Sequence, residues 1–180
     1  SRIGLKLGHA VSGVVGEGLI SRLSGGTWKR GMPQAGKRPA PRSGHGDPVV
    51  YFPACGGRIF GANSPDEATL PEVVMDLLVR AGYAPILPEG FDKLCCGQML
   101  ASKGMAEEAE EMANAVAEAL LKAADDGHGG AYPVIMDAST CSVRMQKHLA
   151  GRIPLYDFHE FAHDALLPRL TIIRKPGPIA

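Results

Sequence analysis

Short apolar runs alternate with helical patterns from residue 49 to residue 170. The runs at 49–52, 84–87, 134–137 and 154–156 have the length and composition of strands. Between them, the spacing of apolar residues predicts helices over 66–82, over about 105–125, from Cys141 or just after it, and over about 157–167. Strands that alternate with helices of this length form parallel βαβ units with right-handed crossovers. We therefore expect an α/β fold with three layers, a Rossmann-like parallel sheet with flanking helices.

Two further segments precede this domain, which we place at 49–170, and a short tail at 171–180 follows it. Residues 3–24 repeat apolar positions at a helical period, which predicts an amphipathic helix over 1–24 that ends at Gly25-Gly26. Residues 25–48 contain six Gly and four Pro among scattered Lys and Arg. This composition is typical of a linker without a core of its own. We interpret its centre as a flexible tether, and a partner-docking segment is the alternative.

The net charge of zero conceals an uneven distribution. Residues 1–47 hold eight Lys or Arg and two acidic residues, so the rest of the chain is mildly acidic. Such a basic segment indicates either a solvated linker or an anionic partner surface. It has no aromatic residue apart from Trp28 between its cations, which argues against nucleic-acid binding.

The cysteine content and the absence of targeting patterns bear on the compartment. No segment reaches the roughly 18 apolar residues that span a bilayer, and the first residues do not form a secretory signal. Four cysteines in 180 residues are too few for a secreted disulfide scaffold. We therefore expect free thiols in a cytoplasmic setting.

The four cysteines follow three different predicted strands. Cys55 comes after the strand at 49–52, Cys95 and Cys96 come after the strand at 84–87, and Cys141 comes after the strand at 134–137. The carboxyl ends of parallel strands lie at one edge of the sheet, where functional groups collect. We therefore expect the four thiols to meet at this edge.

Convergent thiols have three chemical interpretations besides apolar filling of the core. Thiolates hold iron–sulfur clusters, they form four-sulfur zinc sites, and they carry out thiol–disulfide chemistry. Gly97 allows close backbone approach to a bound group and precedes a possible short helix, "QMLASKG". The dipole of that helix and the charge of Lys103 would favour thiolate at Cys95 and Cys96. These considerations leave all three interpretations open.

The sequence around the cysteines resembles that of a known family. The segments "VVYFPACGGRIFG", "PILPEGFDKLCCGQMLASKGM" and "PVIMDASTC" are similar to the cysteine-rich CCG module. That module occurs in heterodisulfide reductases, in the iron–sulfur component of glycolate oxidase, and in FAD-linked D-lactate dehydrogenases. The three segments are most similar to those of the last group. The resemblance covers roughly residues 48–170.

The resemblance implies which residues bind the metal. Cys55, Cys95 and Cys96 match the first three motif cysteines, and Cys141 matches the last cysteine of a Cys-x-x-Cys motif. Ala138 stands where the first cysteine of that motif belongs. The five-cysteine, non-cubane cluster of the full motif thus lacks one ligand here, which leaves a four-ligand cluster, a zinc ion or an apo site.

The resemblance also implies a function. The chain would be an electron-transfer module and a fragment of an FAD-linked D-2-hydroxyacid dehydrogenase, without turnover of its own. FAD and a ferredoxin-like segment would lie outside this chain. The electron acceptor would be a cytochrome or a quinone, and the enzyme would be cytoplasmic or peripheral at the inner membrane. A zinc-binding docking module and a thiol–disulfide module are the alternatives.

Other patterns point to no second site. His159 and His163 are four residues apart on a predicted helix, but no third ligand accompanies them, so we interpret them as surface or packing residues. The chain has no GxGxxG or Walker motif, and no Ser/His/Asp order indicates a hydrolase.

Overall fold

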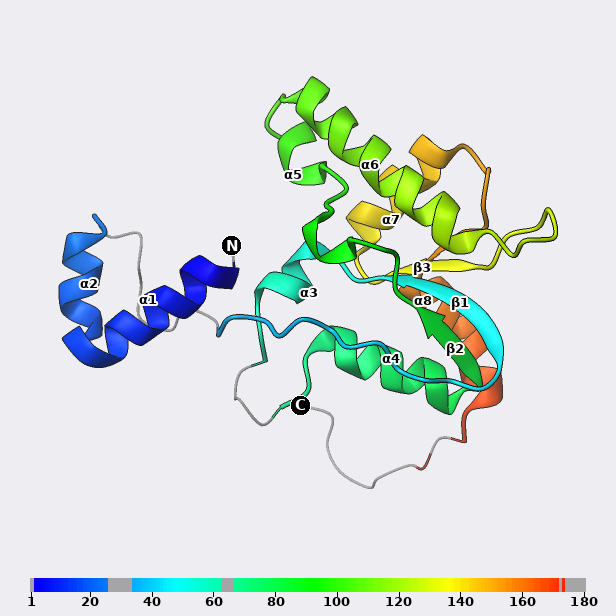
Figure 1. Cartoon of the computed structure of the whole chain (residues 1–180), viewed down its shortest axis with the longest axis horizontal. Coiled ribbons are helices and arrows are strands. Elements are labelled where there is room, and N and C mark those ends of the chain that lie inside the picture. The colour runs from blue at the N-terminus through cyan, green and yellow to red at the C-terminus, as the bar shows by residue number, and fades with distance from the viewer. Residues whose placement is uncertain (1, 26–33, 63–66, 172, 174–180) are drawn as a thin grey trace.

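The computed structural model describes residues 2–25, 34–62, 67–171 and 173 (Figure 1). The elements before the domain are α1 (Arg2–Val15) and α2 (Glu17–Leu23). In the domain, the order is β1 (Asp47–Phe52), α3 (Cys55–Ile59), α4 (Leu70–Arg80), β2 (Tyr83–Ile86), η1 (Phe91–Lys93), α5 (Gln98–Ala101), α6 (Ala106–Ala124), β3 (Val134–Met136), α7 (Ser139–Leu149), β4 (Leu155–Asp157), α8 (Phe158–Phe161), η2 (Ala162–Leu166) and η3 (Leu167–Arg169). Within the described residues, no helix combines the length and apolarity that crossing a membrane requires.

The four strands form one parallel sheet in the order β2-β1-β3-β4. β1 pairs with β2 on one side and with β3 on the other, with Val50 opposite both Ile86 and Val134. Helices cover both faces of this sheet, so the predicted three-layer α/β fold is confirmed (Figure 1).

The alternation of side chains along the strands creates two cores. Val50 and Phe52 of β1 point into the core under α6 and α7, together with Met136 of β3. Val49 and Tyr51 point into the opposite core, under α4 and the helical segment after β4. Successive residues of a strand face opposite sides of the sheet, and each side is buried, which explains the continuous apolar runs in the sequence.

The strand order places a switch point between β1 and β3. The chain leaves β1 toward β2 through α4, then returns across the other face through α6 to β3 on the far side of β1. The connections at the carboxyl ends of β1 and β3 therefore diverge to opposite faces of the sheet. This is where open α/β sheets form their binding crevice.

The first helical region is two helices and not the single one predicted over 1–24. Gly16 separates α1 from α2 with φ at 86° and ψ at 138°, a conformation that an L side chain rarely adopts. The helical period of the sequence continues across this residue, so the period alone did not reveal the break.

The last helical region is also less regular than the predicted helix over 157–167. Four residues of α8 are followed by the π-helical η2 and the 3-10 helix η3. Pro168 lies in the first turn of η3, and its missing N–H and its ring are incompatible with an uninterrupted α-helix. The hydrogen-bond pattern changes before the proline is reached.

The linker segment is described only in part. Residues 26–33, which include much of the expected tether and Trp28, lie outside the described residues. From residue 34 onward the chain contacts the domain: Gly36 N–H donates to Ile59 O over 2.7 Å, and Gly61 N–H donates to Gln34 O over 2.7 Å. Arg42 pairs with Asp76 of α4 at 3.1 Å. Except for residues 171 and 173, the predicted tail also lies outside the described residues.

Candidate metal or redox centre at the carboxyl edge of the sheet

The four cysteines line one cavity of about 280 Å³. Cys55 is the first residue of α3, Cys95 and Cys96 lie between η1 and α5, and Cys141 is in the first turn of α7. Three segments that follow three neighbouring strands thus meet at the carboxyl edge, as the order of strands and cysteines in the sequence predicts. Cys141 is three residues into its helix, which starts at Ser139, slightly earlier than predicted.

The thiols are arranged as two close pairs. Cys55 Sγ lies 3.7 Å from Cys95 Sγ, and Cys96 Sγ lies 3.0 Å from Cys141 Sγ. Four sulfurs at about 2.3 Å from a tetrahedral zinc ion would be about 3.8 Å apart, so the first pair has a spacing that suits one metal. The second pair is closer than two ligands of one ion, and all four cysteines are free thiols. Among the described residues, no group of three or more His, Cys, Asp or Glu side chains is positioned to hold a metal ion.

The proximity of the thiols shifts their pKa values in opposite directions. Hydrogen bonding with Cys55 and Cys96 lowers the pKa of Cys95 far below its ordinary value, and the charge of Arg58 contributes in the same direction. The pKa of Cys55 is raised by the hydrogen bond with Cys95 and by burial. In the second pair, the shared hydrogen bond lowers the pKa of Cys141 and raises that of Cys96. Each pair therefore favours one thiolate, the form that binds metals and attacks disulfides.

The charge of Arg58 acts on the Cys55 and Cys95 thiols, and the sequence did not single this residue out. It is a buried residue of α3, and its guanidinium donates to the carbonyl oxygens of Phe91 and Leu94. It also lies over the Phe52 ring, with 5.6 Å between Cζ and the ring centroid. These contacts fix the loop that carries Cys95 and Cys96 against α3. They also place a permanent positive charge beside the thiolates.

Asp137 joins the two loops that flank the switch point. Its carboxylate accepts a 2.6 Å hydrogen bond from the Tyr51 hydroxyl and another of 2.6 Å from the Ala54 N–H. Ala54 immediately precedes Cys55, and Asp137 itself lines the thiol cavity. Burial raises the pKa of Asp137, against the effect of its hydrogen bonds. The strand predicted over 134–137 is one residue too long, since β3 ends at Met136, and the carboxylate of Asp137 holds the site together.

Gly97 and Lys103 have different positions relative to the cavity. Gly97 directly precedes α5 as its N-cap, with φ at 76°, and a Cβ there would overlap the carbonyl group of Ala109 in α6. Its role in the structure is thus close packing of the Cys95-Cys96 loop against α6. Lys103 is exposed in the turn after α5 and does not line the cavity. From the sequence we expected the charge of Lys103 to favour thiolate at Cys95. In the structure, Arg58 supplies this positive charge.

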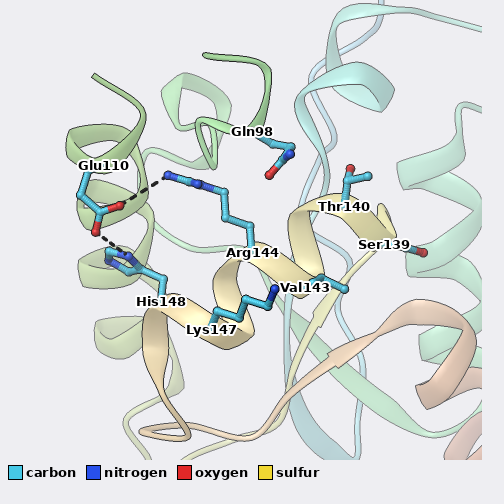
Figure 2. A pocket seen from close by; sticks show the side chains of 8 residues that line it. All are labelled: Gln98, Glu110, Ser139, Thr140, Val143, Arg144, Lys147 and His148. Atoms are coloured by element: carbon cyan, nitrogen blue, oxygen red, sulfur yellow. Dashed lines mark ion pairs between the residues drawn. The ribbon is translucent and has the colours of Figure 1, made fainter. Parts of the chain in front are cut away.

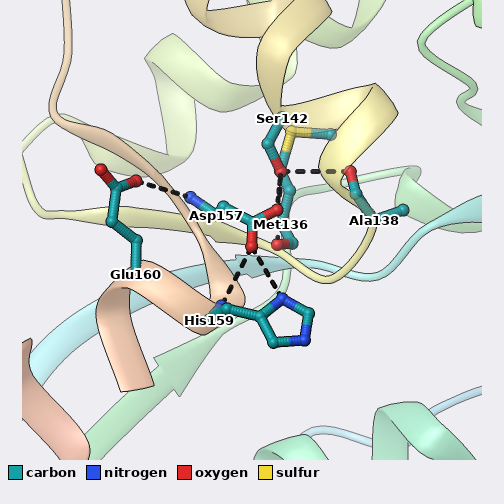
Figure 3. Close-up of polar contacts among 6 residues, drawn as sticks. All are labelled: Met136, Ala138, Ser142, Asp157, His159 and Glu160. Atoms are coloured by element: carbon teal, nitrogen blue, oxygen red, sulfur yellow. Dashed lines mark hydrogen bonds and ion pairs between the residues drawn. The ribbon is translucent and has the colours of Figure 1, made fainter. Parts of the chain in front are cut away.

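A second polar network holds the start of α7 beside Cys141 (Figure 3). The hydroxyl of buried Ser142 lies 3.0 Å from Asp157 Oδ2 and 3.1 Å from Ala138 O. Asp157 also accepts from the N–H of His159 at 3.0 Å, as the cap of α8. Hydrogen bonds from His159, Ser139 and Ser142 lower the pKa of Asp157, although burial opposes them. Ser142 bonds to a carboxylate and not to an imidazole, so this is a structural network and not a hydrolytic triad.

The thiol cavity fits a thiolate-held metal group in its donor chemistry. Four thiols from three segments of the chain face one space, whose remaining wall is largely apolar and includes Leu70, Met99 and Ala138. Such surroundings set the potential of a bound redox group through burial and nearby charge. Ala138, the position of the fifth motif cysteine, contributes only a methyl group to this wall.

Comparison with known proteins also indicates a metal-binding or redox module. The family model described as "CCG: Cysteine-rich domain" matches residues 49–146. Searches of the curated proteins and of the solved structures give no significant match. The matched segment runs from β1 to α7 and contains all four cysteines. The family points to a metal-binding, iron–sulfur or redox module. The match spans more than half of the chain, which therefore belongs to the cysteine-rich CCG domain family.

Proposed function

We propose that this chain is an electron-transfer module in which Cys55, Cys95, Cys96 and Cys141 hold an iron–sulfur cluster. The observation that carries the proposal is the convergence of all four thiols on one cavity at the switch point of the sheet. A cluster in that position accepts and donates single electrons. The residues of the chain hold it, exclude water from it through the apolar wall, and place the charge of Arg58 beside it.

We further propose that the module serves an FAD-linked D-2-hydroxyacid dehydrogenase similar to D-lactate dehydrogenase. This rests on the resemblance of the segments around the cysteines to those enzymes. Hydride abstraction takes place at a flavin outside this chain, and the module passes electrons toward a cytochrome or a quinone. On this proposal the chain alone has no turnover, because the flavin that accepts the hydride lies outside it.

Each of the two alternatives has one distance in its favour. The 3.7 Å between Cys55 and Cys95 fits two ligands of a structural zinc ion, which would make the domain a docking module. The 3.0 Å between Cys96 and Cys141 brings two thiols within reach of disulfide formation, which would make it a thiol–disulfide module. Neither distance accounts for all four cysteines, whereas a cluster uses them all.

Anaerobic reconstitution with iron and sulfide distinguishes the three functions. If the chain holds an iron–sulfur cluster, we expect bound iron and sulfide and a broad absorption at about 400 nm, which sulfur-to-iron charge transfer produces. Colourless protein with one tightly bound zinc ion would establish the docking module. Protein that binds neither metal and forms a reversible disulfide between Cys96 and Cys141 with oxidised glutathione, located by mass spectrometry, would establish the thiol module.

Variants test whether the four thiols act as one site. Cys96→Ser should lose most of the iron and the colour, because every ligand is needed for a stable centre. His163→Ala is the control: it removes a potential ligand whose side chain is 83% exposed and does not line the cavity. Full iron content in Cys96→Ser would contradict a site shared by all four thiols.

A further inference from the structure

A second cavity, the α7 groove, lies beside the thiol cavity and has a different chemical character. It has a volume of about 640 Å³ and lies along α7, opposite α5 and the start of α6 (Figure 2). Its lining residues are Gln98, Glu110, Ser139, Thr140, Val143, Arg144, Lys147 and His148. Seven of these eight residues are polar or charged, whereas the wall around the thiols is largely apolar. The volume is in the range of small-molecule sites.

Positive charge exceeds negative charge in the α7 groove. Arg144 and Lys147 supply two positive charges, and Glu110 supplies the negative one. Glu110 is already held between two partners, Arg144 Nη2 at 3.5 Å and His148 Nδ1 at 3.0 Å (Figure 2). Among the described residues, no ion pair engages Lys147, which is exposed on α7. The groove therefore offers an anion a cation that no carboxylate neutralises.

Arg144 is fixed in position and connects the α7 groove to the cysteine loop. Its Nε donates to Cys96 O at 2.8 Å, and its Nη2 donates to Ala109 O at 3.0 Å. Its side chain is only 19% exposed, so the guanidinium presents a rigid edge to the groove. A preorganised cation of this kind loses little conformational entropy when it binds an anion.

The two cavities share part of their walls. Gln98 and Thr140 line both of them. Thr140 directly precedes Cys141 in the first turn of α7. A molecule bound in the α7 groove would therefore touch the same residues that border the thiols.

From these contacts we infer that the α7 groove is a binding site for a small organic anion, a carboxylate or phosphate. The anionic oxygens pair with Lys147 and with the edge of Arg144, and the Gln98 amide and the Thr140 hydroxyl contact the end of the molecule nearest the cysteines. This inference stands apart from the proposed function, because it rests on the groove and not on a bound cluster.

The test titrates the whole 180-residue chain, free of metal, with succinate and with inorganic phosphate and follows backbone amide shifts by NMR. We expect saturable shifts at Gln98, Thr140 and Lys147 with at least one of the two anions. Lys147→Gln should weaken this binding about tenfold, the effect of losing one hydrogen bond to a charged group. Lys122→Gln is the control, since Lys122 lies on α6 in a pair with Glu89 and outside the α7 groove, and it should bind as the parent does.

A second variant guards against a merely structural effect of Lys147. Val143→Glu keeps the lysine and adds a negative charge to the groove wall, so it should also weaken anion binding, while its amide spectrum reports whether the fold is intact. Shifts that do not saturate, equal binding of neutral succinamide, or equal losses in Lys122→Gln would overturn the inference. Binding of an acidic peptide without binding of either small anion would assign the groove to a protein partner and also overturn it. The readout needs no iron, so failure of cluster assembly leaves this test intact.

Discussion

The hydroxyl of Tyr51 in β1 donates a 2.6 Å hydrogen bond to the carboxylate of Asp137, which follows β3 and lies 86 positions further along the chain. The other oxygen of the same carboxylate receives the Ala54 N–H. One side chain therefore sets the separation between the loop that carries Cys55 and the loop that leads to Cys141. The geometry of the thiol cavity depends on this contact as much as on the cysteines themselves.

Tyr51→Phe should lower the free energy of unfolding by about 2 kcal/mol, the usual worth of a hydrogen bond to a charged group. Combined with Asp137→Asn in a double-mutant cycle, it should show a coupling energy of about 1.5–3 kcal/mol, measured by urea unfolding. Tyr132→Phe removes a hydroxyl from a half-buried tyrosine away from the cavity and should change stability by less than about 0.5 kcal/mol. Additive effects of the first two changes would show that the contact contributes no stability.

Gly97→Ala should be far more damaging than Gly104→Ala. Both glycines have positive φ, at 76° and 81°, so each substitution costs about 1–2 kcal/mol in backbone conformation. At Gly104 a Cβ meets open space, whereas at Gly97 it would overlap the backbone of Ala109. We expect an additional loss of about 1–3 kcal/mol for Gly97→Ala, together with reduced metal uptake. Thermal or urea unfolding of the two variants measures the difference, and equal losses would mean that the loop moves freely away from α6.

Ala138→Cys should add a fifth thiolate to the site. The Ala138 side chain already lines the thiol cavity, so a thiol at this position faces the same space as the other four. We expect the reconstituted variant to show a changed visible spectrum and no additional reactive thiol. Ala131→Cys provides the matched control, because it places a fifth cysteine before β3, at the opposite end of that strand. A fifth thiol that titrates freely in iron-loaded Ala138→Cys would contradict the prediction.

The N-terminus of α4 should make stability depend on pH in the acid range. Glu72 Oε2 accepts from both the N–H and the hydroxyl of Thr69, each at 2.8 Å, and this capping box lowers the pKa of Glu72 below its ordinary value of 4.5. The unfolded chain therefore binds more protons between the two pKa values, so this contribution is complete above about pH 4.5 and is lost as the pH falls through the native pKa.

Glu72→Gln should remove this dependence and cost about 1 kcal/mol near neutral pH, the usual worth of a cap. Unfolding free energies between about pH 3 and pH 6 test it, with Glu111→Gln on the exposed side of α6 as the control. A parallel pH profile for Glu72→Gln and the parent chain would count against the capping role.

The order of strands and helices could be predicted because each element carries its own period. The runs at 49–52 and 134–137 are apolar at almost every position, and the observed strands Asp47–Phe52 and Val134–Met136 differ from them by two residues or fewer at each end. The predicted helices were wrong where the helical period continues through a change of backbone conformation. Gly16 divides the first helix, and the last one changes to π-helical hydrogen bonding at Ala162, before Pro168 is reached.

The convergence of the cysteines could also be predicted from the sequence, because it follows from strand order alone. A cysteine placed after each of three parallel strands comes to one edge whatever the details of packing. The residues that support the thiol cavity could not be predicted in this way. Arg58 lies in a "CGGR" segment that carries no signal of its own, and its partners, Phe91 and Leu94, are 33 and 36 residues away.

The sequence by itself determined the fold class, the edge at which the thiols meet and the family to which the domain belongs, since local periods and the spacing of cysteines carry that information. Only the tertiary structure decided how the thiols pair, which cation stands beside them, and that Asp137 ties their loops together. These features depend on contacts between residues 33 to 86 positions apart. Such contacts exist only after the layers have packed, and no local pattern records them.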